Sequence, residues 1–440
     1  MPNVAVLGGG LAGLAAATAL GSSGFQVDLY EARAFLGGRA TSWPVAGPAG
    51  GEETEMVDNC QHVLLRCCVN LLDLYRRLGV EDKIRFHREF RFIEPGGRTS
   101  VLKRGVLPAP AHFAGSFLGL KYLGIADKIA IARAMYAIPR ERSRADLDRI
   151  SMLDWLREKR QTPRAIERYW RQVLVSAINE ELDRMAAAHG FQVFWLGMIA
   201  RADSYEMGLP DVPLRELYDE RALGGGMRLR CRAAVTAIET EGECVTAIQA
   251  GGERVQADYY VSCLPFERLM PLLPGLPVEW SAFGHSPITG IHLWFDRPVA
   301  DVPHATLLDR TIQWFFNKSE GRYVQLVVSA SRSLTGMPRN EIIALAVREL
   351  AEFFPAVAGA RLEKAHVIKE VRATFSARPG LERLRPASAT HLKNFFLAGD
   401  WTRSGWPATM EGAVRSGYLA AEAVTRACGA PRRFVLPDVA

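Results

Sequence analysis

The chain has 440 residues, of which 48% are hydrophobic and 23% are charged. This length allows two or three substructures around a large core, and the composition excludes a disordered chain. The net charge of +6 suits phosphate-bearing ligands, an anionic membrane surface or nucleic acid, but no helix-turn-helix, zinc-finger or RNP pattern is present, so we expect no nucleic-acid partner.

The first informative element is a glycine motif. Residues 4–7 form a predicted strand, Gly8, Gly10 and Gly13 follow in a G-x-G-x-x-G pattern, and residues 14–20 have the pattern of an apolar helix. The first glycine permits the tight turn, the second lets the backbone approach a pyrophosphate, and the third lets the helix pack on the strand. The free N–H groups at the helix start attract phosphates.

A second predicted strand, residues 27–30, ends at Glu31. An acid at this distance from the glycines accepts hydrogen bonds from ribose hydroxyls. Strand, glycines, helix, strand and acid together predict a dinucleotide-binding βαβ unit. We expect it to contribute Gly8, Gly10, Leu11, Ala12, Gly13, Glu31, Ala32 and Arg33.

A second glycine pair follows, in which Gly37 and Gly38 precede Arg39. Glycines adopt backbone conformations that are closed to residues with a Cβ. The arginine offers a planar, charged fork to a phosphate or a flavin carbonyl. We therefore expect Gly38 and Arg39 at the cofactor.

Residues 106–138 are rich in Phe, Leu, Ile and Ala, but Lys121, Lys128 and Arg133 interrupt them. Apolar helices with a basic fringe lie in a membrane interface. A buried helix pair with a solvated charged rim gives the same pattern. Both interpretations are open.

The remaining chain divides by pattern. Residues 61–218 are predicted to be mainly helical, and residues 224–263 have the alternating pattern of strands. Residues 276–385 also have the alternating pattern of a sheet, with one helix at about 340–354. Residues 429–440 have little pattern, so we expect a disordered tail.

The last strand and helix carry further signals. Residues 395–398 form a predicted strand that runs into Gly399 and Asp400, and a helix begins after Pro407. Asp400 suits the hydroxyls of a ribityl chain, and backbone N–H groups near Met410 suit a flavin carbonyl.

These motifs resemble those of the FAD-dependent amine oxidase and phytoene desaturase superfamily. The run Asp58, Asn59, Cys60, Gln61, His62 and the run Gly399, Asp400, Trp401, Thr402 resemble segments of the hydroxysqualene dehydroxylases within it. The middle segments 169–170, 176–180 and 208–210 fit the same group in order. Many of its members have glycine where this chain has Cys60 and Arg66.

The resemblance implies an α/β fold: a Rossmann-like FAD-binding domain of the glutathione-reductase and amine-oxidase type, with a discontinuous α+β substrate domain. The FAD domain takes residues 1–65, 219–275 and 386–428, and the substrate domain takes 66–218 and 276–385. The implied ligands of a non-covalent FAD include, besides those above, Asn59, Gln61, His62, Val235, Gly399, Asp400, Thr409 and Met410.

The resemblance also implies a long isoprenoid substrate and, as the leading hypothesis, reductive dehydroxylation of hydroxysqualene to squalene. A carotenoid desaturase, a flavin amine oxidase and a non-catalytic prenyl-binding chaperone are the alternatives. His62 is the candidate general acid because histidine titrates in the right range; Asp203 and Glu206 are alternatives. The aromatic candidates for lining a hydrocarbon tunnel are Trp170, Trp195, Trp294, Trp314 and Phe315.

The seven cysteines are odd in number and contain no C-x-x-C pair, so we expect reduced thiols and no metal site. Met1 leads directly into the first predicted strand, and no uncharged run is long enough to cross a bilayer. We therefore expect a cytoplasmic protein, with peripheral membrane contact if the first interpretation of residues 106–138 holds. The source of electrons for the flavin is open.

Overall fold

The computed structural model describes residues 2–46, 54–218 and 227–439. Its first sheet has five parallel strands in the order β10 (Met227–Arg230), β2 (Gln26–Tyr30), β1 (Asn3–Leu7), β14 (Tyr259–Ser262) and β20 (Phe395–Leu397). All five strands come from the three stretches that we assigned to the FAD-binding domain, although the beginning of the second stretch, residues 219–226, lies outside the described residues. The sheet therefore joins the two ends of the chain.

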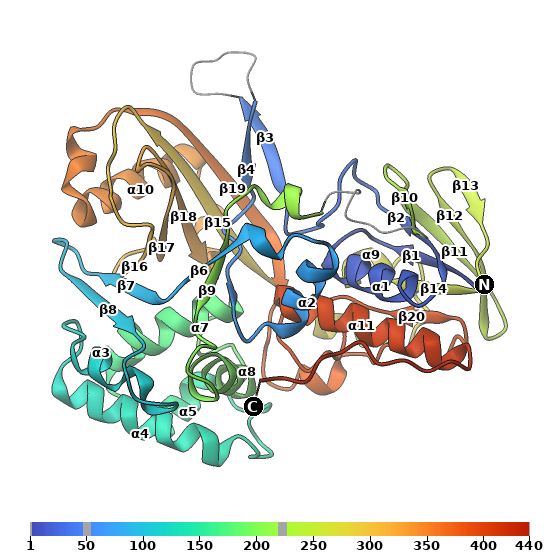
Figure 1. Ribbon diagram of the computed structural model, residues 1–440, viewed down its shortest axis with the longest axis horizontal. Helices are drawn as coiled ribbons and strands as arrows, with labels where there is room; N and C mark the ends of the chain where they lie inside the picture. The colour runs from blue at the N-terminus through green and yellow to red at the C-terminus, as the bar shows by residue number, and fades with distance from the viewer. Residues whose placement is uncertain (1, 47–53, 219–226, 440) are drawn as a thin grey trace.

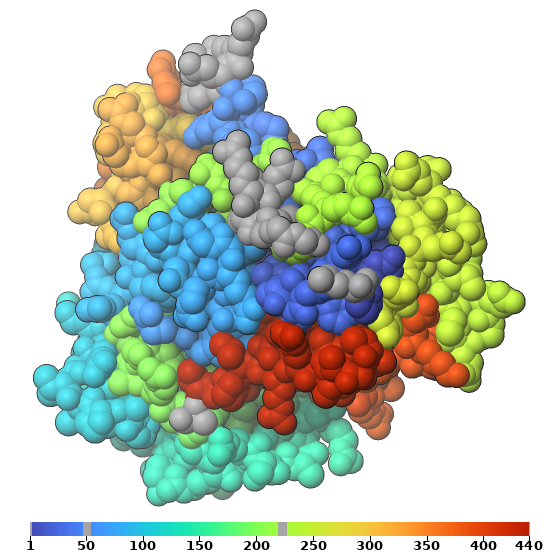
Figure 2. Space-filling view, turned by 45° about the vertical axis from the view of Figure 1, so that its right-hand side comes forward, coloured from blue at the N-terminus to red at the C-terminus, as the bar shows by residue number. Residues whose placement is uncertain are grey.

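Helix α1 (Leu11–Gly21) is buried from Leu11 to Leu20 because it packs on this sheet and on α11 (Met410–Ala427). The two helices lie side by side in Figures 1 and 2, where α1 is blue and α11 is red. A Cβ at Gly417 would lie 2.2 Å from the carbonyl oxygen of Ala12. Only a glycine allows this approach, so the C-terminal helix is fitted to the N-terminal one.

A small antiparallel sheet and a short helix complete this half of the molecule. The sheet contains β11 (Val235–Glu241), β12 (Cys244–Ala250) and β13 (Glu253–Val255), and the helix is α9 (Phe266–Leu269).

The other half is built on a seven-stranded sheet (Figure 1). Its order is β19 (Leu362–Phe375), β15 (His285–Phe295), β18 (Tyr323–Ser329), β17 (Trp314–Ser319), β16 (His304–Leu307), β7 (Glu89–Ile93) and β8 (Thr99–Lys103). Helix α10 (Arg339–Phe353) covers one face, where Ile342 and Leu350 pack against Ile291 and Leu326. This helix is the one expected at about 340–354.

The helical part follows β8 in the chain. It contains α3 (Ala114–Leu118), α4 (Ile125–Glu141), α5 (Met152–Glu158), α6 (Pro163–Ala165), α7 (Arg171–Ile178) and α8 (Ala187–Phe194), with π-helical turns at Ile166–Trp170 and Trp195–Ile199. Trp155, Trp170 and Phe194 form the centre of its core.

Two small sheets connect the halves: β3 (Ser42–Ala46) with β4 (Thr54–Asp58), and β5 (Leu64–Leu65), β9 (Met207–Pro210) and β6 (Ile84–His87). Among the described residues, no helix is both long and apolar enough to cross a membrane.

The C-terminal tail corrects one prediction. We expected residues 429–440 to be disordered, but Phe434 is buried and the backbone N–H groups of Phe434 and Val435 donate to the carboxylate of Glu422. The N–H of Leu436 donates to the side-chain oxygen of Asn70. Partners on α11 and α2 (Val69–Arg77) order this segment, and no pattern within the tail itself reveals them.

Helix α2 corrects a second prediction, the boundary between the two domains. We placed residues 66–218 in the substrate domain, but Leu71, Leu74 and Tyr75 of α2 share the core of α1 and α11. The sequence predicted helical structure for this segment but not the surface on which the helix packs.

Candidate functional site

The turn between β1 and α1 has the geometry that an anion site requires. Gly8 has a φ of +110°, and a Cβ at Gly13 would lie 1.9 Å from the carbonyl oxygen of Gly8. Helix α1 begins after Gly10 without a side-chain cap. The N–H groups of Leu11, Ala12 and Gly13 therefore lie at a helix start that a phosphate can complete.

Glu31 is fixed beside this turn. Its two carboxylate oxygens accept hydrogen bonds from the N–H groups of Gly9 and Arg33, each at 2.8 Å, and the residue is buried. Each oxygen keeps a second lone pair for a ribose hydroxyl. Arg33 donates to the carbonyl of Gly38 at 2.9 Å, while Ala32 is exposed.

The second glycine pair runs along the first. The N–H of Gly37 donates to the carbonyl of Gly9 at 2.9 Å. Gly38 has a φ of +61°, and a Cβ there would lie 2.9 Å from the Cα of Gly10. The loop that carries Arg39 is therefore held against the dinucleotide turn.

Arg39 and Asp400 form an ion pair, with 2.5 Å between Nη2 and Oδ1. A second guanidinium nitrogen of Arg39 donates to the carbonyl of Ala373 at 3.1 Å. Burial opposes the charge of Arg39, but Asp400, together with Glu267 and Glu370, raises the pKa of the guanidinium. The sequence predicted two separate ligands, and the structure brings them into one contact although they are 361 positions apart.

The segment after Asp400 is held by a buried arginine that the sequence analysis missed. The guanidinium of Arg385, fully buried, donates to the carbonyls of Asp400 and Trp406, each at 2.8 Å. It also donates to Thr402 and Ser404. An isolated arginine before a proline gives no signal in a single sequence.

This segment leads into α11. The N–H of Gly399 donates to the hydroxyl of Ser416 at 2.8 Å. The Thr409 hydroxyl caps α11 by accepting from the N–H of Gly412 at 3.1 Å, and Met410 is the first helical residue. The Thr409 side chain thus serves the helix, and the backbone of Met410 remains as the donor to a ligand.

The segment 58–62 lies beside the Arg39 loop. The side-chain amide of Asn59 donates to the carbonyl of Arg39 at 2.8 Å, so Asn59 positions that loop. Gln61 accepts from the ammonium of Lys318 at 3.1 Å, and the same ammonium lies 3.3 Å from Asp58. Lys318 is, after Arg385, the second residue of the site that the sequence analysis missed, because an alternating strand pattern does not mark it.

His62 is oriented by the backbone. Its Nδ1 lies 2.9 Å from the carbonyl oxygen of Cys60. Because a carbonyl only accepts, Nδ1 carries the proton in the neutral ring, and Nε2 is the nitrogen that can accept one. Burial lowers the pKa of His62, and contacts with the carbonyls of Cys60 and Arg39 offset part of that effect.

The two alternative acids are already engaged. Asp203 pairs with Arg201 at 3.0 Å. Glu206 pairs with Arg66 at 2.7 Å and with Arg88 at 3.4 Å. Arg66, which stands where many relatives have glycine, therefore has a carboxylate partner.

The aromatic candidates occupy different places. Trp170 lies in the helical core, and Phe315 packs against Phe354 on the α10 side of the sheet. The indole of Trp314 donates to Ser176 at 2.6 Å, and the Trp294 ring stacks on Tyr323 with 4.4 Å between centroids. Trp195 carries the guanidinium of Arg142 on its face. These rings do not gather along one path.

Val235 begins β11, and the loop before it is attached to the site because the N–H of Ala233 donates to the carbonyl of Glu31 at 2.9 Å. Among the described residues, no cluster of His, Cys, Asp or Glu has the arrangement of a metal site. The glycine turn, the acid at the end of β2 and the Asp400 segment together fit a dinucleotide that carries a polyol chain.

Comparison with known proteins gives matches over nearly the whole chain. The family described as flavin containing amine oxidoreductase matches residues 11–425. A probable zeta-carotene desaturase from Synechococcus elongatus is 28% identical over 97% of this chain and 99% of its own length. A 15-cis-phytoene desaturase from the same organism is 26% identical over 96% of this chain and 95% of its own length.

Solved structures show the same fold. An oxidoreductase from Methanosarcina mazei superposes with a TM-score of 0.71 at 16% identity, over 94% of this chain and 98% of its own. Putrescine oxidase superposes with a TM-score of 0.69 at 16% identity, over 97% and 98% of the two chains.

Proposed function

The chain belongs to the family of flavin-containing amine oxidoreductases, and we propose that within this family it acts on an acyclic isoprenoid, which it desaturates. It is an FAD-dependent oxidoreductase of the amine oxidase and desaturase superfamily. The observation that carries the proposal is the similarity of 94–97% of the chain to zeta-carotene and phytoene desaturases.

The ligand residues of the proposal come from both ends of the chain. Leu11, Ala12 and Gly13 hold the pyrophosphate and Glu31 holds the adenosine ribose. Asp400 and Arg39 hold the ribityl chain and the ring edge, and Met410 offers its backbone N–H. FAD supplies hydride transfer, and the protein supplies binding, orientation and exclusion of water.

The state of His62 favours desaturation. Removing two hydrogen atoms from neighbouring carbons takes one away as hydride and releases the other as a proton, which needs an acceptor. Dehydroxylation instead needs a proton donor for the departing oxygen. A His62 whose pKa is lowered and whose Nδ1 donates to a carbonyl can accept a proton at Nε2, which suits the first role.

Dehydroxylation of hydroxysqualene, our leading hypothesis from the sequence, is the second candidate. The relatives named above are carotenoid desaturases, so they support the alternative rather than this hypothesis. The resemblance of Asp58–His62 and Asp400–Thr402 keeps it as a candidate, because the two segments meet at Arg39.

One experiment separates the two. Purified enzyme with oxidised FAD is incubated without oxygen with phytoene or zeta-carotene, and photoreduced enzyme is incubated with hydroxysqualene. We expect a product two mass units lighter, with flavin bleaching, in the first reaction only. Squalene in the second reaction with no product in the first would replace desaturation by dehydroxylation, and no product in either would refute the isoprenoid assignment.

A further inference from the structure

The outward face of α4 is apolar. Ile125 is 80% exposed, Ile129 is 48% exposed and Tyr136 is 65% exposed. At about 100° per residue these three side chains fall within about 40° of one another around the helix. Ile131 and Ile138 on the opposite face are buried, so α4 has one apolar face in the core and a second one toward solvent.

Three more exposed apolar residues lie before α3 and at its end. Val106 is 102% exposed, Leu107 is 48% exposed and Leu118 is 68% exposed. The ammonium of Lys128 donates to the carbonyl of Leu118 at 2.6 Å, which joins α3 to α4. We call Val106, Leu107, Leu118, Ile125, Ile129 and Tyr136 the apolar patch. Helices α3 and α4, which carry four of these residues, lie at the end of the molecule remote from the five-stranded sheet (Figure 1).

The patch is surrounded by positive charge. Between residues 103 and 140 the cations are Lys103, Arg104, Lys121, Lys128, Arg133 and Arg140, and Asp127 is the only acid. Asp127 is buried and accepts from the N–H of Gly124 at 2.8 Å. Its charge is therefore turned inward, and the exposed charges along this segment are positive. Glu141, the last residue of α4, pairs with Arg144 and Lys159.

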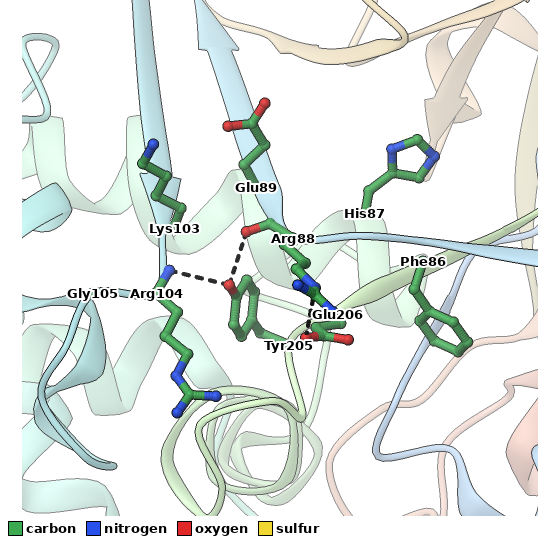
Figure 3. A pocket seen from close by; sticks show the side chains of 9 residues that line it. All are labelled: Phe86, His87, Arg88, Glu89, Lys103, Arg104, Gly105, Tyr205 and Glu206. Carbon is green, nitrogen blue, oxygen red and sulfur yellow. Dashed lines mark hydrogen bonds and ion pairs between the residues drawn. The ribbon is translucent and has the colours of Figure 1, made fainter.

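A pocket of about 730 Å³ opens beside the patch (Figure 3). The Tyr205 hydroxyl spans it, accepting from the N–H of Arg104 at 3.1 Å and donating to the carbonyl of Arg88 at 2.8 Å. No acidic side chain among the described residues pairs with Lys103 or Arg104, whereas Glu89, which also lines the pocket, pairs with Arg91. The pocket thus presents unpaired cations where the chain runs into Val106.

We propose that the apolar patch and its cations dock this protein on a bilayer of anionic phospholipids, with a headgroup phosphate at Lys103 and Arg104. Apolar side chains enter the acyl boundary while flanking cations meet the phosphates. A second copy of the chain would bring the same cations against this patch, and like charges repel. The inference rests on the proposed function in one respect: an isoprenoid substrate dissolves in the same bilayer.

The test is co-sedimentation of the full-length holoenzyme with vesicles. We expect binding to phosphatidylglycerol vesicles to exceed binding to phosphatidylcholine vesicles, and to weaken as salt rises. The double variant Ile125→Glu/Ile129→Glu, and separately Lys103→Glu/Arg104→Glu, should each weaken binding about tenfold or more. Met270→Glu, at an apolar residue that is 43% exposed outside the patch, should bind as the wild type does.

Three results would overturn the proposal: a wild type that does not bind vesicles, a double variant that binds as well as the wild type, or a wild-type dimer in vesicle-free solution that Ile125→Glu/Ile129→Glu dissociates. Circular dichroism of each variant excludes misfolding as the cause of lost binding. Activity on detergent-dispersed isoprenoid is measured in parallel, so a failure of docking is distinguishable from a failure of the proposed reaction.

Discussion

Replacing Gly10 by alanine separates cofactor binding from folding. A Cβ at Gly10 would meet only the Cα of Gly38, at 3.7 Å, which is an ordinary contact. The backbone of Gly10, with φ −78° and ψ −177°, is open to alanine. The lower entropy of the unfolded chain and the weaker helix cap nearly cancel, so we expect the free energy of unfolding of the apoprotein to change by less than about 1 kcal/mol.

The same Cβ points to where the pyrophosphate must approach the backbone. Forcing a methyl group into such a contact costs roughly 1–3 kcal/mol, which weakens FAD binding about 5- to 150-fold. The assay is titration of apoprotein with FAD by flavin fluorescence, with thermal unfolding of the apoprotein measured in parallel. Gly13→Ala is the contrasting variant, because its Cβ would lie 1.9 Å from the carbonyl oxygen of Gly8 and should destabilise the fold itself. Wild-type FAD affinity in Gly10→Ala would refute the placement of the phosphates.

Three further predictions follow from the same site. Asp400→Ala removes the partner of Arg39 and should weaken FAD binding by about 1–3 kcal/mol in the same titration. The control Asp296→Ala, in the surface pair with Arg297, should leave FAD binding unchanged. If Asp400→Ala binds FAD as tightly as the wild type does, Asp400 is not an FAD ligand. Arg385→Met leaves the carbonyl of Asp400 without a donor and removes one donor from the carbonyl of Trp406. It should lower the free energy of unfolding in urea by about 3 kcal/mol or more, whereas the exposed Arg383→Met should change it little. A stable Arg385→Met would show that the loop keeps its conformation without this arginine. If His62 accepts the proton, the turnover rate should be constant above the lowered pKa of His62 and should fall as the pH decreases through that value. His62→Gln should remove this pH dependence. A turnover rate that instead falls as the pH rises would make His62 a general acid.

The dinucleotide turn could be predicted because its geometry is local. Gly8, Gly13 and the uncapped start of α1 lie within one short unit, and each glycine answers a steric requirement of its neighbours. Glu31 was found for the same reason, since the length of a βα unit fixes how far along the chain the next strand ends.

The long-range contacts were beyond the sequence. Arg39 and Asp400 were each selected by type, but nothing in their patterns shows that they pair. Arg385 and Lys318 serve carbonyls and side chains that are remote in sequence, so no periodicity marks them. The order of residues 430–439 depends on Glu422 and Asn70 in the same way.

Residues 106–138 were ambiguous because hydropathy does not say which apolar side chains face inward. The structure divides α4 into a buried face and an exposed apolar face, and this division carries the membrane proposal.

The account as a whole is tested most directly by a crystal structure of the protein with FAD bound. We expect the pyrophosphate at the N–H groups of Leu11–Gly13, the adenosine ribose at Glu31 and the ribityl chain within hydrogen-bond distance of Asp400. An FAD held by the N-terminal turn alone, with Asp400 and Met410 away from the flavin, would contradict the account.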